Sequence, residues 1–115
     1  MLSDKETNIL ECIIDYCKRI EGKMSGVSKQ FFRKDKDIQD IVCFNVMQIG
    51  EMANKLSTTF TKRYNLQPWS DIVGMRHVIV HAYGQVEHKD IWECATKEIK
   101  PLREYCEKIL KENNK

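Results

Sequence analysis

The sequence predicts an all-α fold: an up-and-down four-helix bundle with a short extra helical turn. Apolar residues recur at spacings of three and four over most of the chain, the period of a helix with one buried face. Only two prolines and five glycines interrupt this pattern, and no stretch alternates polar and apolar residues as a half-buried strand does. The chain is long enough for a core of its own, so residues 1–115 are predicted to form a single domain.

The first helix is predicted to run from about Asp4 to Ile20. Ser3 or Asp4 caps its N-terminus, and Glu6 lies in the first turn, as in a capping box. Gly22 is the predicted stop, and Gly26 marks the loop. The apolar stripe of this helix consists of Ile9, Leu10, Ile13, Ile14 and Cys17.

A short turn over residues 27–32 is expected next, followed by a long second helix. This helix is predicted to begin near Asp35 or Asp37 and to continue to about Leu56. Its long, two-faced stripe suits the centre of a bundle or a subunit interface. The stripe comprises Ile38, Ile41, Val42, Asn45, Val46, Ile49, Met52, Ala53 and Leu56.

The helical pattern weakens over residues 57–69, where threonines are frequent. A connection with about one turn of helix is predicted there. A third helix is expected to begin with a Ser-Asp cap at 70–71 and to end at Gly84. The last helix is predicted over residues 89–110, bent near Pro101.

Charge and hydropathy exclude few functions. With 19 basic and 17 acidic residues, the net charge of +2 is too small to predict or exclude an RNA substrate. Each local basic cluster is either a solvated helix end or a phosphate-attracting patch. No apolar run approaches the roughly 18 residues of a membrane span, so no membrane partner and a cytoplasmic location are expected. The clusters are Lys18, Arg19 and Lys23; Lys29, Arg33, Lys34 and Lys36; and Lys62 and Arg63.

The five cysteines are an odd number and include no CxxC pair. We interpret them as reduced thiols that serve as small hydrophobic residues in a reducing compartment. The spacing of zinc ligands is absent from them. No metal and no cofactor are therefore expected. The cysteines are Cys12, Cys17, Cys43, Cys94 and Cys106.

The polar chemistry of the chain is concentrated in residues 74–84. Arg76, His77, His81 and Tyr83 fall within eight residues of an otherwise apolar helix, and each buried polar group requires a partner. At about 100° per residue, Arg76 and Tyr83 lie nearly in line, while His77 and His81 share another face. Arg76 and His81 are about 140° apart. They converge only if the helix ends at His81 or if a second copy in a symmetric dimer supplies the other half.

Three interpretations of these residues stay open at this point. In the first, a histidine takes the proton of an RNA 2′-hydroxyl while an arginine offsets phosphate charge, with no metal. In the second, Arg76 pairs with an acid such as Glu51 on the second helix, and the histidines are satisfied core groups. In the third, His77 and His81 bind a metal, although Val78 replaces the glutamate of an HExxH motif.

Arg76-x4-His81-x-Tyr83 resembles the Rx4HxY motif of the HepT-like HEPN family. Other stretches resemble the same family in the same order, so that the resemblance extends from Phe32 to about Leu102. They are Phe32-x-x-Asp35, Gln39-Asp40, Ile49-Gly50-Glu51-x-Ala53, Leu56-Ser57, Trp69-x-x-Ile72-x-Gly74-Met75-Arg76 and Val86 through Trp92. His77 departs from the pattern, because a polar amide is common at that position in the family.

The resemblance implies a helical bundle that dimerises, with the motifs of two protomers lining a shared cleft. It implies a metal-independent endoribonuclease that is the toxin of a HEPN/MNT toxin–antitoxin pair. The implied partner is an MNT-type nucleotidyltransferase, the antitoxin, which transfers AMP from ATP to the motif tyrosine. Carried over to this chain, Arg76 and His81 are the catalytic pair and Tyr83 is the modified residue.

Two further residues receive supporting roles. His77 shares the base role, tunes His81 or simply substitutes for the amide, and Glu51 holds Arg76 or caps a helix. The alternative from a different functional class is a non-catalytic helical partner of a nucleotidyltransferase. Such a protein binds nucleotide or RNA without cutting it.

Overall fold

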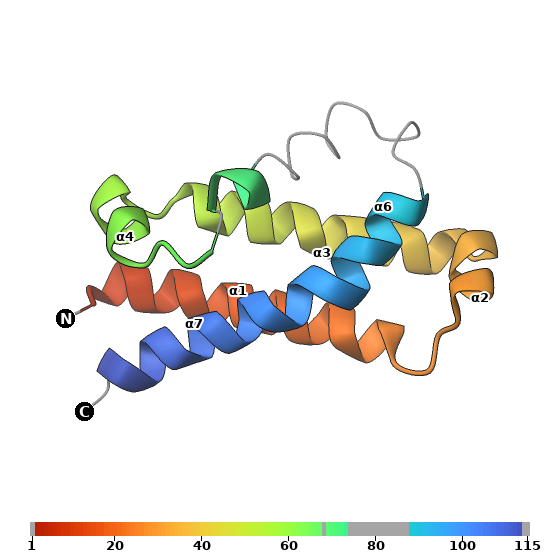
Figure 1. The fold of residues 1–115 in the computed structure, drawn as a ribbon, viewed down its shortest axis with the longest axis horizontal. Helices are drawn as coiled ribbons and strands as arrows, with labels where there is room; N and C mark the ends of the chain where they lie inside the picture. Colours follow the sequence, from red (N-terminus) through yellow and green to blue (C-terminus); the bar gives the residue numbers. More distant parts are fainter. Residues whose placement is uncertain (1, 68, 74–87, 114–115) are drawn as a thin grey trace.

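A computed structural model describes residues 2–67, 69–73 and 88–113 of the chain. All regular secondary structure in these ranges is helical, which confirms the predicted all-α class. Three long helices run side by side along the molecule, and two short helices lie at its opposite ends (Figure 1). The four-helix arrangement and the homodimer stay predictions. No helix among the described residues is both long and apolar enough to span a membrane.

The first helix, α1 (Asp4–Met24), begins where the sequence predicted. The Ser3 hydroxyl oxygen accepts a hydrogen bond from the Glu6 backbone N–H at 3.1 Å, and the Glu6 carboxylate accepts one from the Ser3 N–H at 2.9 Å. This is the reciprocal pair of a capping box. The predicted stop at Gly22 is wrong. A glycine within a helix costs only about 1 kcal/mol, and the chain turns instead at Gly26, whose φ is +74°.

One residue joins the short helix α2 (Lys29–Lys34) to the long helix α3 (Lys36–Asn54). The backbone N–H of Asp35 donates to the carbonyl of Phe31 at 3.0 Å and closes α2. Its carboxylate accepts from the N–H of Ile38 at 3.0 Å and caps α3. The predicted start of the second helix near Asp35 is therefore confirmed. The turn expected over residues 27–32 is a six-residue helix.

The core lies where α1 packs against α3 on one side and α7 (Ile99–Asn113) on the other. Most of the stripe residues predicted from the sequence are buried there. The side chains that are almost fully enclosed are Leu10, Ile13, Cys17, Ile20, Phe32, Val42, Ile49, Cys106 and Ile109.

An ion-pair network ties α7 to α1 at the edge of this core. The guanidinium of Arg103 donates to both carboxylate oxygens of Glu21, at 2.5 and 3.1 Å, and to Glu107 at 2.7 Å. The hydrogen bonds that Arg103 donates to Glu21 and Glu107 raise the pKa of its guanidinium. A forked, two-point contact of this kind fixes the relative position of two helices more sharply than a single ion pair does.

Between α3 and the motif the chain is more helical than predicted. The six-residue helix α4 (Thr58–Arg63) begins after Ser57, whose hydroxyl accepts from the N–H of Phe60 at 3.0 Å. The Phe60 side chain is buried, so tertiary packing outweighs the weak helix propensity of the threonines. Residues 69–73 are helical, one residue earlier than the predicted cap. The predicted end of that helix at Gly84 lies outside the described residues.

The last predicted helix consists of three consecutive segments. These are α6 (His88–Glu93), the π-helical segment η1 (Cys94–Glu98) and α7. The backbone N–H of Ile99 donates to the carbonyl of Cys94, five residues earlier. Pro101 has no N–H and crowds the carbonyl four residues before it, which is that of Lys97 within the irregular segment. The departure from a regular helix thus lies just before the predicted bend.

All five cysteines are free thiols. Cys12 is exposed, and the other four are buried in the core, as expected for small hydrophobic residues. Burial raises the pKa of Cys43 to about 11 and the pKa of Cys94 and Cys106 to about 12. Burial also raises the pKa of Cys17. These four groups are therefore held as neutral thiols.

We expect one thiol of the folded protein to react quickly with an aromatic disulfide reagent at about pH 8, near the ordinary pKa of a thiol. The thiolate is the reacting species, and only Cys12 is exposed, whereas the other four thiols are buried. The released chromophore should correspond to one equivalent in buffer and five in denaturant. Cys12→Ser should abolish the fast phase. Two or more fast equivalents in the parent protein would contradict the described burial.

Candidate functional site

The predicted motif residues Arg76, His77, His81 and Tyr83 lie outside the described residues. Glu51, the predicted supporting acid, lies on α3 and is half-buried. The structure therefore establishes the surroundings of the motif: the chain that leads into it, the helix that follows it, and the surfaces next to that helix.

The chain leading into the motif is held by an aromatic cluster around Trp69. The Trp69 side chain is 5% exposed, and its indole N–H donates to the carbonyl of Tyr64 at 2.6 Å. Its ring centroid lies 6.0 Å from that of Phe60 and 6.3 Å from that of Tyr105. Because Tyr105 belongs to α7, this cluster ties residues 69–73 to the core helices.

The chain following the motif is held by a second aromatic contact. Helix α6 packs against α2 and α3. The ring of Trp92 on α6 lies 5.5 Å from the ring of Phe32 on α2, in a tilted arrangement that favours aromatic pairs. The neighbouring Ile91 is buried. Both ends of the motif-bearing segment are therefore anchored by packed aromatic side chains.

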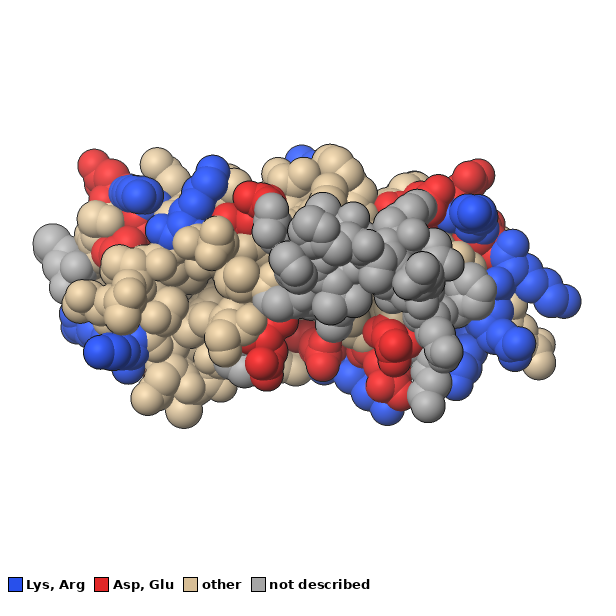
Figure 2. Space-filling view, turned by 90° about the horizontal axis from the view of Figure 1, so that it is seen from above, with Lys and Arg blue, Asp and Glu red and all other residues tan. Residues whose placement is uncertain are grey.

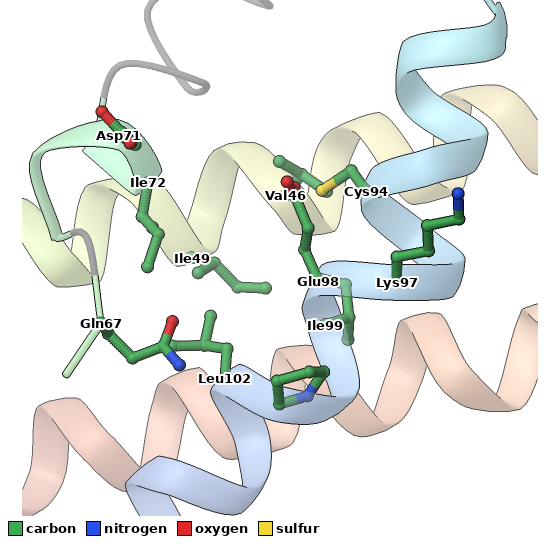
Figure 3. A pocket seen from close by; sticks show the side chains of 11 residues that line it. Val46, Ile49, Gln67, Asp71, Ile72, Cys94, Lys97, Glu98, Ile99 and Leu102 are labelled. Atoms are coloured by element: carbon green, nitrogen blue, oxygen red, sulfur yellow. The ribbon is translucent and has the colours of Figure 1, made fainter.

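A cavity of about 300 Å³ lies between α3, residues 67–72 and the η1–α7 junction. In Figure 3 the side chains of Ile49, Ile72 and Leu102 point toward one another across it, while the carboxylate of Asp71 points away. Apolar walls of this kind suit an apolar group better than a phosphodiester. The described lining is Val46, Ile49, Gln67, Asp71, Ile72, Cys94, Lys97, Glu98, Ile99, Pro101 and Leu102.

Two buried amides on α3 have structural roles that the periodicity did not reveal. Gln39 is 8% exposed, and its amide nitrogen donates to the carbonyls of Phe32 at 2.7 Å and Arg33 at 3.2 Å. It thereby fastens the end of α2 to α3. Asn45 is 5% exposed and donates to the carbonyl of Ile41 at 2.8 Å. Asn45 stood in the predicted stripe of the second helix, so a buried polar residue could be expected there, whereas Gln39 lay outside that stripe.

Comparison with known proteins assigns the chain to a family. Residues 13–109 match the family described as "Ribonuclease HepT-like". The chain belongs to the HepT-like ribonuclease family. The matched range includes Arg76 to Tyr83 and all of α2 and α3. The resemblance deduced from the Rx4HxY motif is therefore confirmed at the level of the family.

Relatives of this HepT-like chain carry related names. The "Putative RNase" of Caldanaerobacter subterraneus subsp. tengcongensis is 32% identical over 101 residues, which are 88% of this chain and 90% of the relative. The "Probable ribonuclease HepT" of Thermococcus cleftensis is 28% identical over 102 residues, which are 89% of this chain and 93% of the relative. No solved structure matches the chain.

One relative is longer than the others named here. The "Gamma-glutamylcyclotransferase and putative RNase" of Methanocaldococcus jannaschii is 30% identical over 106 residues. These residues are 92% of the HepT-like chain but only 48% of the relative. The shared region therefore corresponds to about half of that protein.

Proposed function

We propose that this HepT-like protein is a metal-independent endoribonuclease and the toxin of a toxin–antitoxin pair. The observation that carries the proposal is the set Arg76, His81 and Tyr83 at Rx4HxY spacing inside a chain that matches the family over residues 13–109. The names of its relatives support ribonuclease activity at the level of the family. As an enzyme acting on cellular RNA, it works in the cytoplasm as a single domain.

The proposed reaction uses the RNA's own 2′-hydroxyl as nucleophile. His81 takes the hydroxyl proton, the 2′-oxygen bonds to phosphorus, and the bond from phosphorus to the 5′-oxygen breaks. The departing 5′-oxygen takes up a proton, leaving a cyclic 2′,3′-phosphate and a 5′-hydroxyl end. Arg76 offsets the negative charge that develops on the phosphate oxygens, a task suited to its permanent charge and forked donors. His77 and Glu51 are proposed to orient this pair.

The proposed control of the toxin is covalent. An MNT-type nucleotidyltransferase transfers AMP from ATP to Tyr83: the phenol oxygen bonds to the α-phosphorus and pyrophosphate leaves. AMP adds bulk and negative charge close in sequence to Arg76, and so takes the place of a substrate phosphate. No cofactor of the toxin itself is needed for either step.

The proposed active unit is a homodimer. Arg76 and His81 diverge on one ideal helix, and a two-fold axis brings the arginine of one protomer toward the histidine of the other. Phe44, midway along α3, is 52% exposed, so its ring is available for a second protomer to cover.

The decisive experiment combines intact mass with RNA cleavage. The purified chain, incubated with its nucleotidyltransferase and ATP, should gain mass in AMP-sized steps, and Tyr83→Phe should not. The unmodified chain should cut RNA in the presence of a chelator, and the modified chain should not. Mass gain without cleavage would instead identify a non-catalytic binding partner of the nucleotidyltransferase. No mass gain and no cleavage would overturn the proposal.

A further inference from the structure

The surface around α2 carries a cluster of exposed basic side chains that has no role in the reaction proposed above. We call it the α2 surface and define it by Lys29, Phe31, Arg33, Lys34 and Lys36, all of them exposed. Residues 29–37 contain four basic and two acidic side chains. This segment therefore carries a net charge of +2. Figure 2 shows Lys and Arg side chains gathered at the end of the molecule where Figure 1 places α2.

The two phenylalanines of α2 have opposite environments. Phe32 is fully buried and packs against Trp92, whereas Phe31 is 50% exposed among the basic side chains. The buried side-chain amide of Gln39 donates hydrogen bonds to the carbonyls of Phe32 and Arg33. The backbone that carries Phe31 is thus fixed from inside the protein, and its ring is presented to solvent on a rigid support.

The two acids of this region lie at the N-terminus of α3, where the positive end of the helix dipole partly offsets their charge. The carboxylate of Asp35 is engaged by the N–H of Ile38 at the N-terminus of α3. Asp37 lies in the first turn of the same helix. Two of the three basic side chains of α2, Arg33 and Lys34, lie in its last turn, and Lys29 is its first residue.

An open hollow of about 410 Å³ lies beside the exposed ring. Phe31, Lys34, Asp35, Lys36 and Asp37 line it. A flat aromatic face next to cationic side chains is how sequence-tolerant proteins bind single-stranded nucleic acid: bases stack on the ring and phosphates meet the cations. A duplex buries its bases and offers no free base to such a ring.

The α2 surface lies close in space to the helix that follows the motif. Helix α6 packs on α2 through Trp92 and Phe32 and begins at His88. His81 precedes His88 by seven residues, and seven residues of chain extend to about 25 Å at most. At about 3.4 Å per nucleotide along a stacked strand, several nucleotides bridge this distance.

We propose that the α2 surface binds the single-stranded RNA substrate beside the cleavage site. One base stacks on Phe31, and neighbouring phosphates contact Lys34, Lys36 and Arg33. This inference rests on the proposed ribonuclease function and adds to it the class of substrate and the surface that holds it. RNA cut by the motif is then held at two places, so the α2 surface controls affinity rather than the chemical step.

The test measures both binding and cleavage. Binding is followed by fluorescence anisotropy with a labelled single-stranded RNA of about 20 nucleotides, enough to cover such a site. Its 2′-oxygens are methylated, so it cannot be cut by a 2′-hydroxyl mechanism. Phe31→Ala should weaken binding about tenfold, a typical loss for one stacked base. With cleavable RNA the same variant should raise KM by a similar factor and leave kcat nearly unchanged.

The contribution of the basic side chains to RNA binding is measured by the salt dependence of the affinity. Lys34→Gln with Lys36→Gln should lower the slope of log affinity against log salt by about 1.4, because each phosphate contact to a single strand contributes about 0.7. The matched control removes the same charge at the other end of the molecule. Lys62→Gln with Arg63→Gln, and separately Leu66→Ala, alter exposed residues in and after α4. These control variants should bind as the parent does.

The outcomes separate this inference from the proposed function. If the parent cuts RNA while the α2 variants keep parental affinity, KM and salt dependence, the inference is overturned and the nuclease stands. If the parent binds RNA through the α2 surface without cutting it, the inference stands and the nuclease fails. Loss of nucleotidyltransferase binding, with RNA affinity unchanged, would reassign the surface to the antitoxin and overturn the inference.

Discussion

Replacing His81 with alanine is expected to lower the rate of RNA cleavage by about 10²- to 10⁴-fold, the usual contribution of a general base. Alanine cannot take the 2′-hydroxyl proton, whereas Arg76 and the α2 surface would still hold the phosphates. We therefore expect the loss in kcat, with a KM close to that of the parent. The measurement is steady-state cleavage of a labelled single-stranded RNA, with folding checked by circular dichroism.

A mixing experiment serves as its control. Arg76→Ala is expected to be inactive too, because the phosphate loses its cation. When the two inactive variants are refolded together, half of the dimers contain one chain of each kind. A site shared between protomers is then intact once in each mixed dimer, which restores about a quarter of the parental activity. No recovery would place Arg76 and His81 of one chain in the same site. A His81→Ala protein that cuts as fast as the parent would remove His81 from the mechanism.

Replacing Phe32 with alanine is expected to destabilise the protein by about 3–5 kcal/mol, the usual result for a buried phenylalanine. The side chain is fully enclosed and supports Trp92, the anchor of α6. Small domains are stable by only about 5–15 kcal/mol, so the variant should unfold at much lower urea concentration. The measurement is urea unfolding followed by circular dichroism, in reducing buffer.

The adjacent residue provides the matched control. Phe31→Ala removes the same atoms from a half-exposed position, so its stability should stay within about 0.5 kcal/mol of the parent. The two substitutions therefore distinguish two roles of phenylalanine. Phe32→Ala should lower the stability, and Phe31→Ala should weaken RNA binding. Equal destabilisation by both substitutions would contradict the described packing of α2.

Local sequence signals predicted the fold where one residue type has one dominant physical effect. Ser3 with Glu6 marks a helix start because the pair satisfies two backbone donors at once. Asp35 marked the start of α3 for a similar reason. The helix end predicted at Gly22 was wrong because glycine permits a helix to end but does not require it. Helix α4 was underestimated because the burial of Phe60, which stabilises it, depends on parts of the chain distant in sequence.

The candidate site was predictable to a smaller extent. The Rx4HxY spacing of Arg76, His81 and Tyr83 indicated the family, yet helical geometry alone left several interpretations of these residues open. The α2 surface was visible only as a run of charges. Its second component, an exposed ring beside a buried one, depends on which of two adjacent phenylalanines faces the core. Adjacent residues of the same type cannot be distinguished by composition or by charge.

The four buried thiols determine what happens once the protein unfolds. In the unfolded chain these side chains return to an ordinary pKa near 8.5 and become nucleophilic together. Without a reductant they pair with one another or with a second chain, and the resulting disulfides obstruct refolding. Molecules that unfold are then lost irreversibly. The quantity that describes stability is therefore the half-life of the folded protein, which the rate of unfolding sets. In a reducing medium the thiols stay unpaired, so the protein can unfold and refold repeatedly without loss.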